Sequence, residues 1–399
     1  MQTYQLDFLA LIRHYFFQEP IDEILAYDSL YTLARDQHLI PMIYESCREL
    51  DHFKQADPAI QTQMRYSAIG QIITQQQYDH ELERINECFK QDGLKPLVLK
   101  GRICRETYPQ PDYRCSADED LLIKTEDYPR YAKILTANGY ICQARAEVDE
   151  TILKHSQTIN FTNHHLTLEL HIHPFGTNHE LHQRMNRYFL DSCDHPYYSE
   201  PFYTLQPTEH YLFLIFHLYK HFLSAGVGVR QLLDLLLYKK AYADKIDMAF
   251  IDQALEDMHI TKLYDALMQC GDTYLHFPYE KPKFKQKLEP LMENLLVSGC
   301  TGSFSETQAY SSAFTNSMVS RSEGNRLSQI GYLLFPSLGQ MQKVYPVLKE
   351  HPKRLPIYWC KRYRRIFRKI LHKDFDVNES LSIAKQREKL YRQYDIFGR

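Results

Sequence analysis

Cysteine motifs are absent from this chain. It has nine cysteines in 399 residues, an odd number, and no two of them form a CxxC pair. An odd count without paired spacing argues against a disulfide framework, and the missing CxxC argues against a cysteine zinc site. We therefore expect free thiols in a reducing, cytoplasmic environment.

Long hydrophobic runs are also missing. The most apolar stretch, YLFLIFHLYKHFL, contains His217, Lys220 and His221, and it is shorter than the ~20 apolar residues that a membrane-spanning helix needs. The first residues, MQTYQLDFLALIRHYF, carry Asp7 inside their apolar stretch and have no basic leader, which is untypical of a signal peptide. We expect no membrane span and no cleaved leader.

The chain also lacks a large excess of positive or negative charge. The net charge is −3, so the whole molecule is not a polyanion binder by charge alone, and any basic function must be local. With 44% apolar and 24% charged residues, the composition is that of a folded globular protein. No internal repeat is visible, and a chain of 399 residues is expected to form two or three domains.

The order of local patterns predicts an α+β fold. Helical spacing of apolar residues marks the region before residue 93, and it returns after residue 205 in EHYLFLIFHLYKHFL and GVRQLLDLLLYKKAY. Between them we expect short helices at 102–108 and 126–138, and strands at 96–100, 118–123, 157–162 and 166–172. We therefore predict a small mixed-sheet core flanked by helical regions, with domains over 1–92, 93–205 and 206–399. The polar stretch from Thr301 to Asn325 is expected to be a long loop.

Acidic side chains stand at the mouth of one predicted strand, in the sequence RCSADEDLLI. In a strand, residues two apart share a face, so Asp118 and Asp120 project together and Glu119 projects oppositely. Glu169 lies on the face of its own strand that carries no leucines. If these strands pair, three carboxylates converge, which suits Mg²⁺. A D-x-D pair also marks many ordinary solvated strand ends.

A glycine precedes this acidic strand. Gly101 follows the predicted strand PLVLK and opens a short predicted helix. Glycine lets a phosphate approach the backbone, and a helix N-terminus favours anions. Each of these signals is weak alone. The combination of a strand–glycine–helix unit, a D-x-D pair on the next strand and an acid on a later strand is more specific for a site that binds phosphate and metal.

These motifs resemble a known family. The stretch LKGRICRETYPQPDYRCSADEDLLI resembles the nucleotidyltransferase fold of DNA polymerase beta-like enzymes, and it is most similar to a bacterial group of uncharacterised nucleotidyltransferases. The resemblance runs from about residue 94 to 370. Its matching positions are Lys100, Gly101, Tyr108, Pro109, Arg114, Asp118, Asp120, Glu169, His171, His221, Gly226, Gly228, Arg230 and Asp234.

The resemblance implies transfer of a nucleoside monophosphate from an NTP to a hydroxyl by a two-metal mechanism. It implies that Asp118, Asp120 and Glu169 hold Mg²⁺ or Mn²⁺ and are the catalytic residues. It also implies a set of residues that contact the nucleotide and its phosphates: Lys100, Gly101, Arg102, Arg114, His171, His221 and Arg230. The acceptor stays open among a small molecule, a protein and an RNA end.

Two positions depart from the family pattern. Arg102 follows Gly101 where a small residue is usual, and Glu119 stands between the acids where a hydrophobic residue is usual. The missing small residue bears on the triphosphate cradle, and an inward-facing Glu119 would add negative charge to the site. These departures motivate an alternative, a non-catalytic protein that binds a nucleotide or a partner on the same fold.

Two other features have competing interpretations. Seven histidines between residues 155 and 182 could form a zinc site, but their spacing is irregular and no HExxH occurs, which favours loop and surface histidines. Residues 353–373 contain nine Lys or Arg and no acid. This segment is expected to be a basic helix, and three interpretations stay open: a solvated face, which is the default, a contact with an anionic membrane surface, and a contact with nucleic acid or phosphate. Its charge density indicates some anionic partner.

Overall fold

The computed structural model describes most of the chain. The described residues are 1–24, 26–144, 147–177, 180–224, 226–299, 338, 341, 345, 347–371, 385 and 387–396. The loop predicted at 301–325 lies outside them. Buried apolar side chains from the N-terminal helices, the sheet and the following helices form one continuous hydrophobic cluster. The predicted division at 92/93 and 205/206 stays a prediction.

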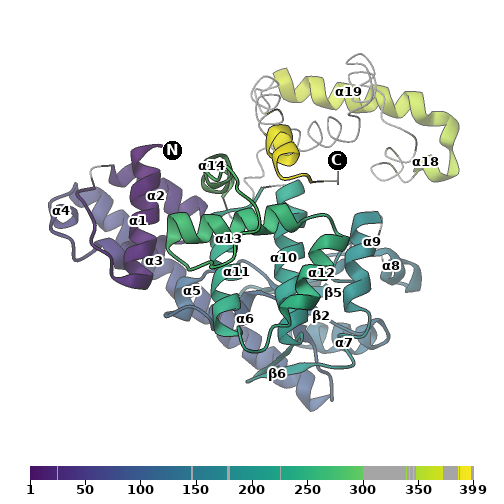
Figure 1. The fold of residues 1–399 in the computed structure, drawn as a ribbon. Coiled ribbons are helices and arrows are strands. Elements are labelled where there is room, and N and C mark those ends of the chain that lie inside the picture. The colour runs from purple at the N-terminus through teal and green to yellow at the C-terminus, as the bar shows by residue number, and fades with distance from the viewer. Residues whose placement is uncertain are drawn as a thin grey trace.

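The N-terminal region is helical, as predicted. It comprises α1 (Thr3–Phe17), α2 (Tyr27–Asp36), α3 (Ile40–Cys47), α4 (Asp51–Lys54) and α5 (Pro58–Gln91). Helix α5 starts cleanly because the Asp57 side chain accepts a hydrogen bond from the Ala59 N–H at 2.8 Å and a proline occupies the first turn. It passes beneath the sheet region in Figure 1 and contacts α7.

A mixed seven-stranded sheet forms the core within the described residues. Its spatial order is β3-β4-β5-β2-β1-β7-β6. The strands are β1 (Leu97–Val98), β2 (Glu119–Leu122), β3 (Ile141–Cys142), β4 (Thr158–Thr162), β5 (Thr167–His171), β6 (Tyr197–Ser199) and β7 (Phe202–Thr204). Strands β1, β2, β4 and β5 confirm the four predicted ones, and the α+β class is confirmed with them. The prediction missed β3, β6 and β7.

Strands β2 and β5 run parallel at the middle of this sheet. Their register places Asp120 opposite Glu169 and Leu122 opposite His171. Apolar residues alternate with these polar ones, and Leu121, Leu168 and Leu170 are fully buried. Burial of the leucine face therefore fixes the register, and the register in turn aligns the polar face.

Short helices connect the strands. They are α6 (Gly101–Arg105), η1 (Pro111–Tyr113), η2 (Thr125–Asp127), α7 (Tyr128–Ala137), α8 (Glu150–His155), α9 (Glu180–Asn186) and η3 (Arg187–Phe189). Helix α6 contacts both β1 and β2. The chain segment from α6 to β2 carries five of the ten predicted phosphate and metal residues.

The C-terminal region is again helical. It comprises α10 (Pro207–Leu223), α11 (Val229–Ala241), α12 (Met248–Asp257), α13 (Thr261–Leu275), α14 (Glu289–Ser298), α18 (Val347–Glu350), η4 (Pro352–Arg354) and α19 (Leu355–Leu371). Helix α10 contacts α11 and α12, and α11 contacts α6. Through α11, this region is joined to the helix that opens at Gly101.

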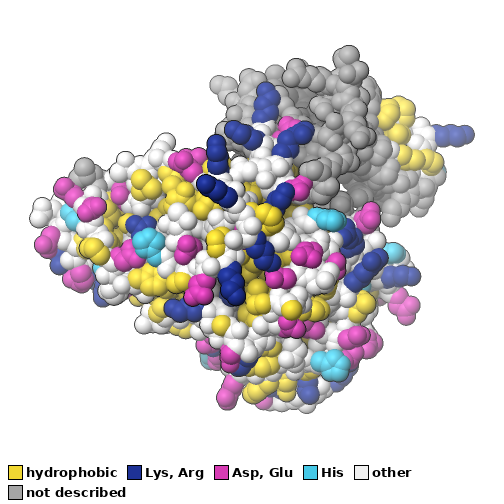
Figure 2. Space-filling model, in the orientation of Figure 1, with side chains coloured by type: hydrophobic (Ala, Val, Ile, Leu, Met, Phe, Trp, Pro, Cys, Tyr) yellow, Lys and Arg dark blue, Asp and Glu magenta, His cyan; other side chains and the backbone are white. Residues whose placement is uncertain are grey.

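The predicted basic helix is present as α19, which contacts η4 and stands apart from the sheet in Figure 1. On the face drawn in Figure 2, basic and acidic side chains are interspersed, in keeping with the net charge of −3. The described cysteines carry free thiols, as expected. None of the described helices combines the length and the apolar character needed to cross a membrane.

Candidate active site

A cavity of about 380 Å³ collects most of the predicted site residues. Its walls come from the segment leading into β2, from β2 and β5, and from α10 and α11. Eight of the ten predicted residues line it: Lys100, Arg114, Asp118, Asp120, Glu169, His171, His221 and Arg230. The structure thus brings together residues that lie as far apart as 100 and 230 in the sequence.

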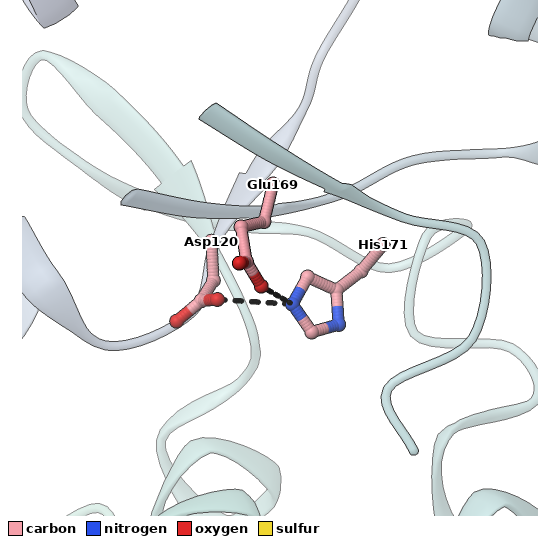
Figure 3. Close-up of side chains that lie close together, drawn as sticks. All are labelled: Asp120, Glu169 and His171. Atoms are coloured by element: carbon pink, nitrogen blue, oxygen red, sulfur yellow. Dashed lines mark hydrogen bonds and ion pairs between the residues drawn. The ribbon is translucent and has the colours of Figure 1, made fainter. Parts of the chain in front are cut away.

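The acidic side of the cavity is built on β2 and β5. His171 Nε2 lies 3.0 Å from Asp120 Oδ1 and 3.8 Å from Glu169 Oε2 (Figure 3). Among the described residues, Asp120, Glu169 and His171 form the one group of three potential metal ligands whose donor atoms all lie within 4.8 Å of one another. The paired strands therefore bring two of the three predicted carboxylates together, with the imidazole of His171 as the third member of the group.

Asp118 lies just before β2, so it is outside the regular strand. It is half-buried and lines the same cavity, but it does not belong to the closely spaced group of three. Its negative charge still reaches that group, because it helps to raise the pKa of both Lys100 and Glu169. Asp118 is therefore an electrostatic neighbour of the cluster in this structure.

Lys100 links the acidic side to the helical side. Its ammonium lies 2.8 Å from Asp120 Oδ2 and 3.3 Å from His217 Nε2. Burial would lower the pKa of Lys100, but the charges of Asp120 and Asp118 outweigh burial and raise it. Lys100 is thus held as a cation inside the site.

The two carboxylates respond oppositely to this environment. Burial would raise the pKa of Asp120, but Lys100 and the hydrogen bond from His171 hold it well below its usual range. Glu169 lacks such close cations: burial and the negative charges of Asp120 and Asp118 raise its pKa. Glu169 Oε1 accepts one hydrogen bond from Asn160 Nδ2 at 3.1 Å. The site therefore has negative charge that a bound cation would stabilise.

Gly101 and Arg102 do not line the cavity, and Glu119 explains why. Glu119 projects to the opposite face from Asp120, is 1% exposed, and ion-pairs with Arg105 Nη2 at 2.8 Å. Its Oε2 also accepts a hydrogen bond from the Arg102 N–H at 3.0 Å. The anion at the start of α6 is therefore a side chain of the protein itself.

Gly101 is required by this arrangement. A Cβ at this position would lie 2.0 Å from Glu119 Oε2 and 2.4 Å from Glu119 Cδ. The Arg102 side chain turns toward Glu106 and Glu83 and lies over the Phe202 ring. The triphosphate contacts predicted for Gly101 and Arg102 stay a prediction, and the placement of neither residue supports it.

Arg114 is buried and held by Asp234. Its Nε and Nη2 donate to the two carboxylate oxygens at 3.1 and 2.7 Å, and the Tyr108 hydroxyl donates to Oδ1 at 2.8 Å. Burial would raise the pKa of Asp234, but the Arg114 guanidinium lowers it. Arg230 donates to the backbone oxygen of Cys115. Asp234 therefore joins the segment before β2 to α11.

The helical side of the cavity is rich in nitrogen. Lys220, His217 and His221 line it from α10, and His38 reaches it from the N-terminal region. Sequence reasoning included His221 and missed the other three as site residues. The spacing 217, 220 and 221 on one helix was the available signal, because residues three and four apart lie side by side. No local pattern pointed to His38.

The zinc interpretation finds no support in this geometry. Among the described histidines of residues 155–182, His171 alone belongs to a group of converging metal ligands, and its partners there are carboxylates. Those partners provide hard oxygen donors, which suit Mg²⁺ and Mn²⁺, and the imidazole extends the choice toward Mn²⁺. The donor set therefore fits the divalent cation that the motifs implied.

The mixed sheet, the D-x-D pair at the start of β2 and Glu169 on the neighbouring strand together are typical of a nucleotidyltransferase-like α+β protein. The sequence model of the family described as "Uncharacterised nucleotidyltransferase" matches residues 25–276. The chain belongs to that family. The match begins before the stretch that carries the motif resemblance and ends before its C-terminal part. No curated protein and no solved structure matches the chain.

Proposed function

We propose that this protein transfers a nucleoside monophosphate from an NTP to a hydroxyl acceptor in the cavity between β2, β5 and α10. The observation that carries the proposal is the register of two parallel strands, which sets Asp120 opposite Glu169. Membership of a nucleotidyltransferase family supports the same activity.

Asp120, Glu169 and His171 would hold the divalent cation, Mg²⁺ or Mn²⁺, and Asp118, which lines the same cavity, would contribute to a second metal position. When bound, such ions lower the pKa of a coordinated hydroxyl and neutralise charge on phosphate oxygens. A buried carboxylate, Asp120, beside a half-buried one, Glu169, is costly without compensation, and burial and the neighbouring negative charges raise the pKa of Glu169. This cost supports a cation site.

The reaction is a displacement at the α-phosphorus. The acceptor oxygen forms a bond to that phosphorus, the bond from phosphorus to the bridging β-oxygen breaks, and pyrophosphate leaves with the bond electrons. The acceptor proton passes to the Glu169 carboxylate in this proposal. Lys100, held as a cation 2.8 Å from Asp120, faces the position where charge builds on the phosphate oxygens.

The test uses each NTP labelled at the α-phosphate, incubated with the protein, cell extract and Mg²⁺ or Mn²⁺. We expect label in an acceptor and one pyrophosphate released per label transferred. The labelled fraction (small molecule, protein or RNA) identifies the acceptor class. Asp120→Asn and Glu169→Gln should abolish both signals, whereas Glu126→Gln, at an exposed position after β2, should retain them. Equal turnover in the wild type and Asp120→Asn would defeat the proposal.

A second function is favoured by one observation. Both oxygens of Asp120 already have partners within the chain, Lys100 at 2.8 Å and His171 at 3.0 Å. A site neutralised by its own side chains could bind a nucleotide or a partner without chemistry. Calorimetric binding of NTP that is independent of Mn²⁺, with no pyrophosphate released under any condition above, would establish this alternative.

A further inference from the structure

The face of α10 that looks into the cavity carries three nitrogenous side chains. His217, Lys220 and His221 all line the cavity, and all three are only partly exposed. They face the carboxylates of β2 and β5 across the space. The cavity therefore has one anionic wall and one wall made of an ammonium and two imidazoles.

Lys220 is a half-buried cation that forms no ion pair within the described part of the chain. Among the described residues, no carboxylate lies within ion-pair distance of it, and its recorded hydrogen bond is a long one, 3.5 Å to Gln157 Oε1. Burial, and then the charge of Lys100, lower its pKa. Lys100 in the same cavity has Asp120 at 2.8 Å and a raised pKa. Only one of the two ammoniums is therefore compensated by the protein.

The two imidazoles extend this wall. His221 Nε2 lies 3.2 Å from His217 Nε2, which in turn lies 3.3 Å from the Lys100 ammonium. Burial lowers the pKa of both rings, and that of His221 falls to about 3. They are therefore neutral near pH 7 and add no charge. Each neutral ring carries one N–H, which in His217 is at Nδ1 because its Nε2 accepts from the Lys100 ammonium. Donors of this kind beside an unpaired ammonium form a site for an anion with several oxygens.

The start of α6 is closed to such an anion. The Glu119 carboxylate already accepts from the Arg102 N–H, and it occupies the space over Gly101. A phosphate there would meet a buried carboxylate held by Arg105. The usual place for phosphate in a strand–glycine–helix unit is thus filled in this chain.

We propose that His217, Lys220 and His221 on α10 bind the β- and γ-phosphates of the nucleotide, in place of the turn at Gly101. This inference rests on the proposed function for the identity of its ligand. In this arrangement the triphosphate extends from the carboxylates of Asp120 and Glu169 on the sheet to the Lys220 ammonium on α10, and it passes Lys100.

The experiment is calorimetric titration with inorganic tripolyphosphate in EDTA. Lys220→Met should weaken binding at least ten-fold and His221→Asn should weaken it less, because the asparagine amide keeps a donor on a shorter side chain. Lys220→Met should also raise the melting temperature of the unliganded protein, since it removes a half-buried charge that forms no ion pair within the described residues. Lys240→Met, at an exposed position of α11, should change neither property.

In Lys220→Met, lower tripolyphosphate affinity together with a higher melting temperature indicates a binding role. If Lys220 were only structural, the substitution would lower both the affinity and the melting temperature. Three results would overturn the inference: no tripolyphosphate binding by the wild type, unchanged affinity in Lys220→Met, or a loss in Arg102→Gln that exceeds the loss in Lys220→Met. Tripolyphosphate binding that depends on Lys220, without NTP turnover, would sustain this inference while the transferase proposal fails. Turnover with Lys220→Met unaffected would do the reverse.

Discussion

Replacing Gly101 with alanine should destabilise the fold through a single contact. The new Cβ would lie 2.0 Å from Glu119 Oε2 and 2.4 Å from Oε1, so the carboxylate must move. It has nowhere to go without breaking its ion pair to Arg105, because Glu119 is 1% exposed and Arg105 is fully buried. The added methyl group of Gly101→Ala therefore breaks the buried ion pair between Glu119 and Arg105.

The magnitude follows from two opposing effects. Breaking a buried ion pair costs about 3–5 kcal/mol, whereas alanine is favoured over glycine inside a helix by about 1 kcal/mol. We expect Gly101→Ala to lower the free energy of unfolding by about 2–4 kcal/mol. In a Glu119→Ala background the obstacle is gone, and only the small helical preference for alanine remains. Arg105 keeps Asp79 as a partner at 2.5 Å in that background.

The assay is a double-mutant cycle by urea unfolding of the wild type, the two single variants and the double variant. A coupling energy of about 3 kcal/mol or more between Gly101 and Glu119 is expected. The double variant should also bind tripolyphosphate as Glu119→Ala alone does. A Gly101→Ala variant as stable as the wild type, or costs that simply add, would refute the reasoning.

Three further predictions concern ionisable side chains in the interior and in the cavity. Asp234→Asn should cost about 3–5 kcal/mol in urea unfolding because it leaves Arg114 buried and without an ion-pair partner. Asp252→Asn, whose side chain is 40% exposed in its pair with Lys283, should cost less than about 1 kcal/mol. Burial lowers the pKa of His210 to about 3, so the unfolded chain alone takes up its proton as the pH falls below 6.5. From pH 7 to 5, His210→Asn should therefore lose about 2 kcal/mol less stability than the wild type does. Glu169→Gln should raise the melting temperature in EDTA and remove the stabilisation by Mn²⁺, measured by scanning calorimetry.

Each of these has a clear opposite outcome. Equal costs for Asp234→Asn and Asp252→Asn would show that the buried pair is not special. Parallel stability curves for His210→Asn and the wild type between pH 7 and 5 would mean that the folded protein accepts the proton on this ring. Full Mn²⁺ stabilisation in Glu169→Gln would remove that carboxylate from the cation site.

The central strands of the sheet could be predicted from sequence because apolar and polar residues alternate in β5 and a short apolar run follows the acids in β2. Leu166, Leu168, Leu170 and Ile172 alternate with polar residues, so only one face can be buried, and Glu169 must occupy the other. The pairing of β2 with β5 was only a condition of the prediction, and the structure supplies it. The strands that were missed are two or three residues long, and such runs are too short to show a period.

The outcome at Glu119 shows where sequence reasoning stopped. Alternation predicted correctly that Glu119 faces away from Asp118 and Asp120, but it does not say whether that face is solvated. The answer depends on Arg105, fourteen residues earlier, which enters the same interior and pairs with the carboxylate at 2.8 Å. Compensation by a partner distant in sequence leaves no local signal.

The cation and phosphate positions can be tested together in one crystal. Crystals grown with Mn²⁺ and a non-hydrolysable NTP analogue, measured at the manganese absorption edge, should give an anomalous peak bonded to Asp120 and Glu169, with the β- and γ-phosphates against Lys220 and His221. A nucleotide bound with its phosphates at Gly101 and Arg102, or with no manganese at the two carboxylates, would contradict the account.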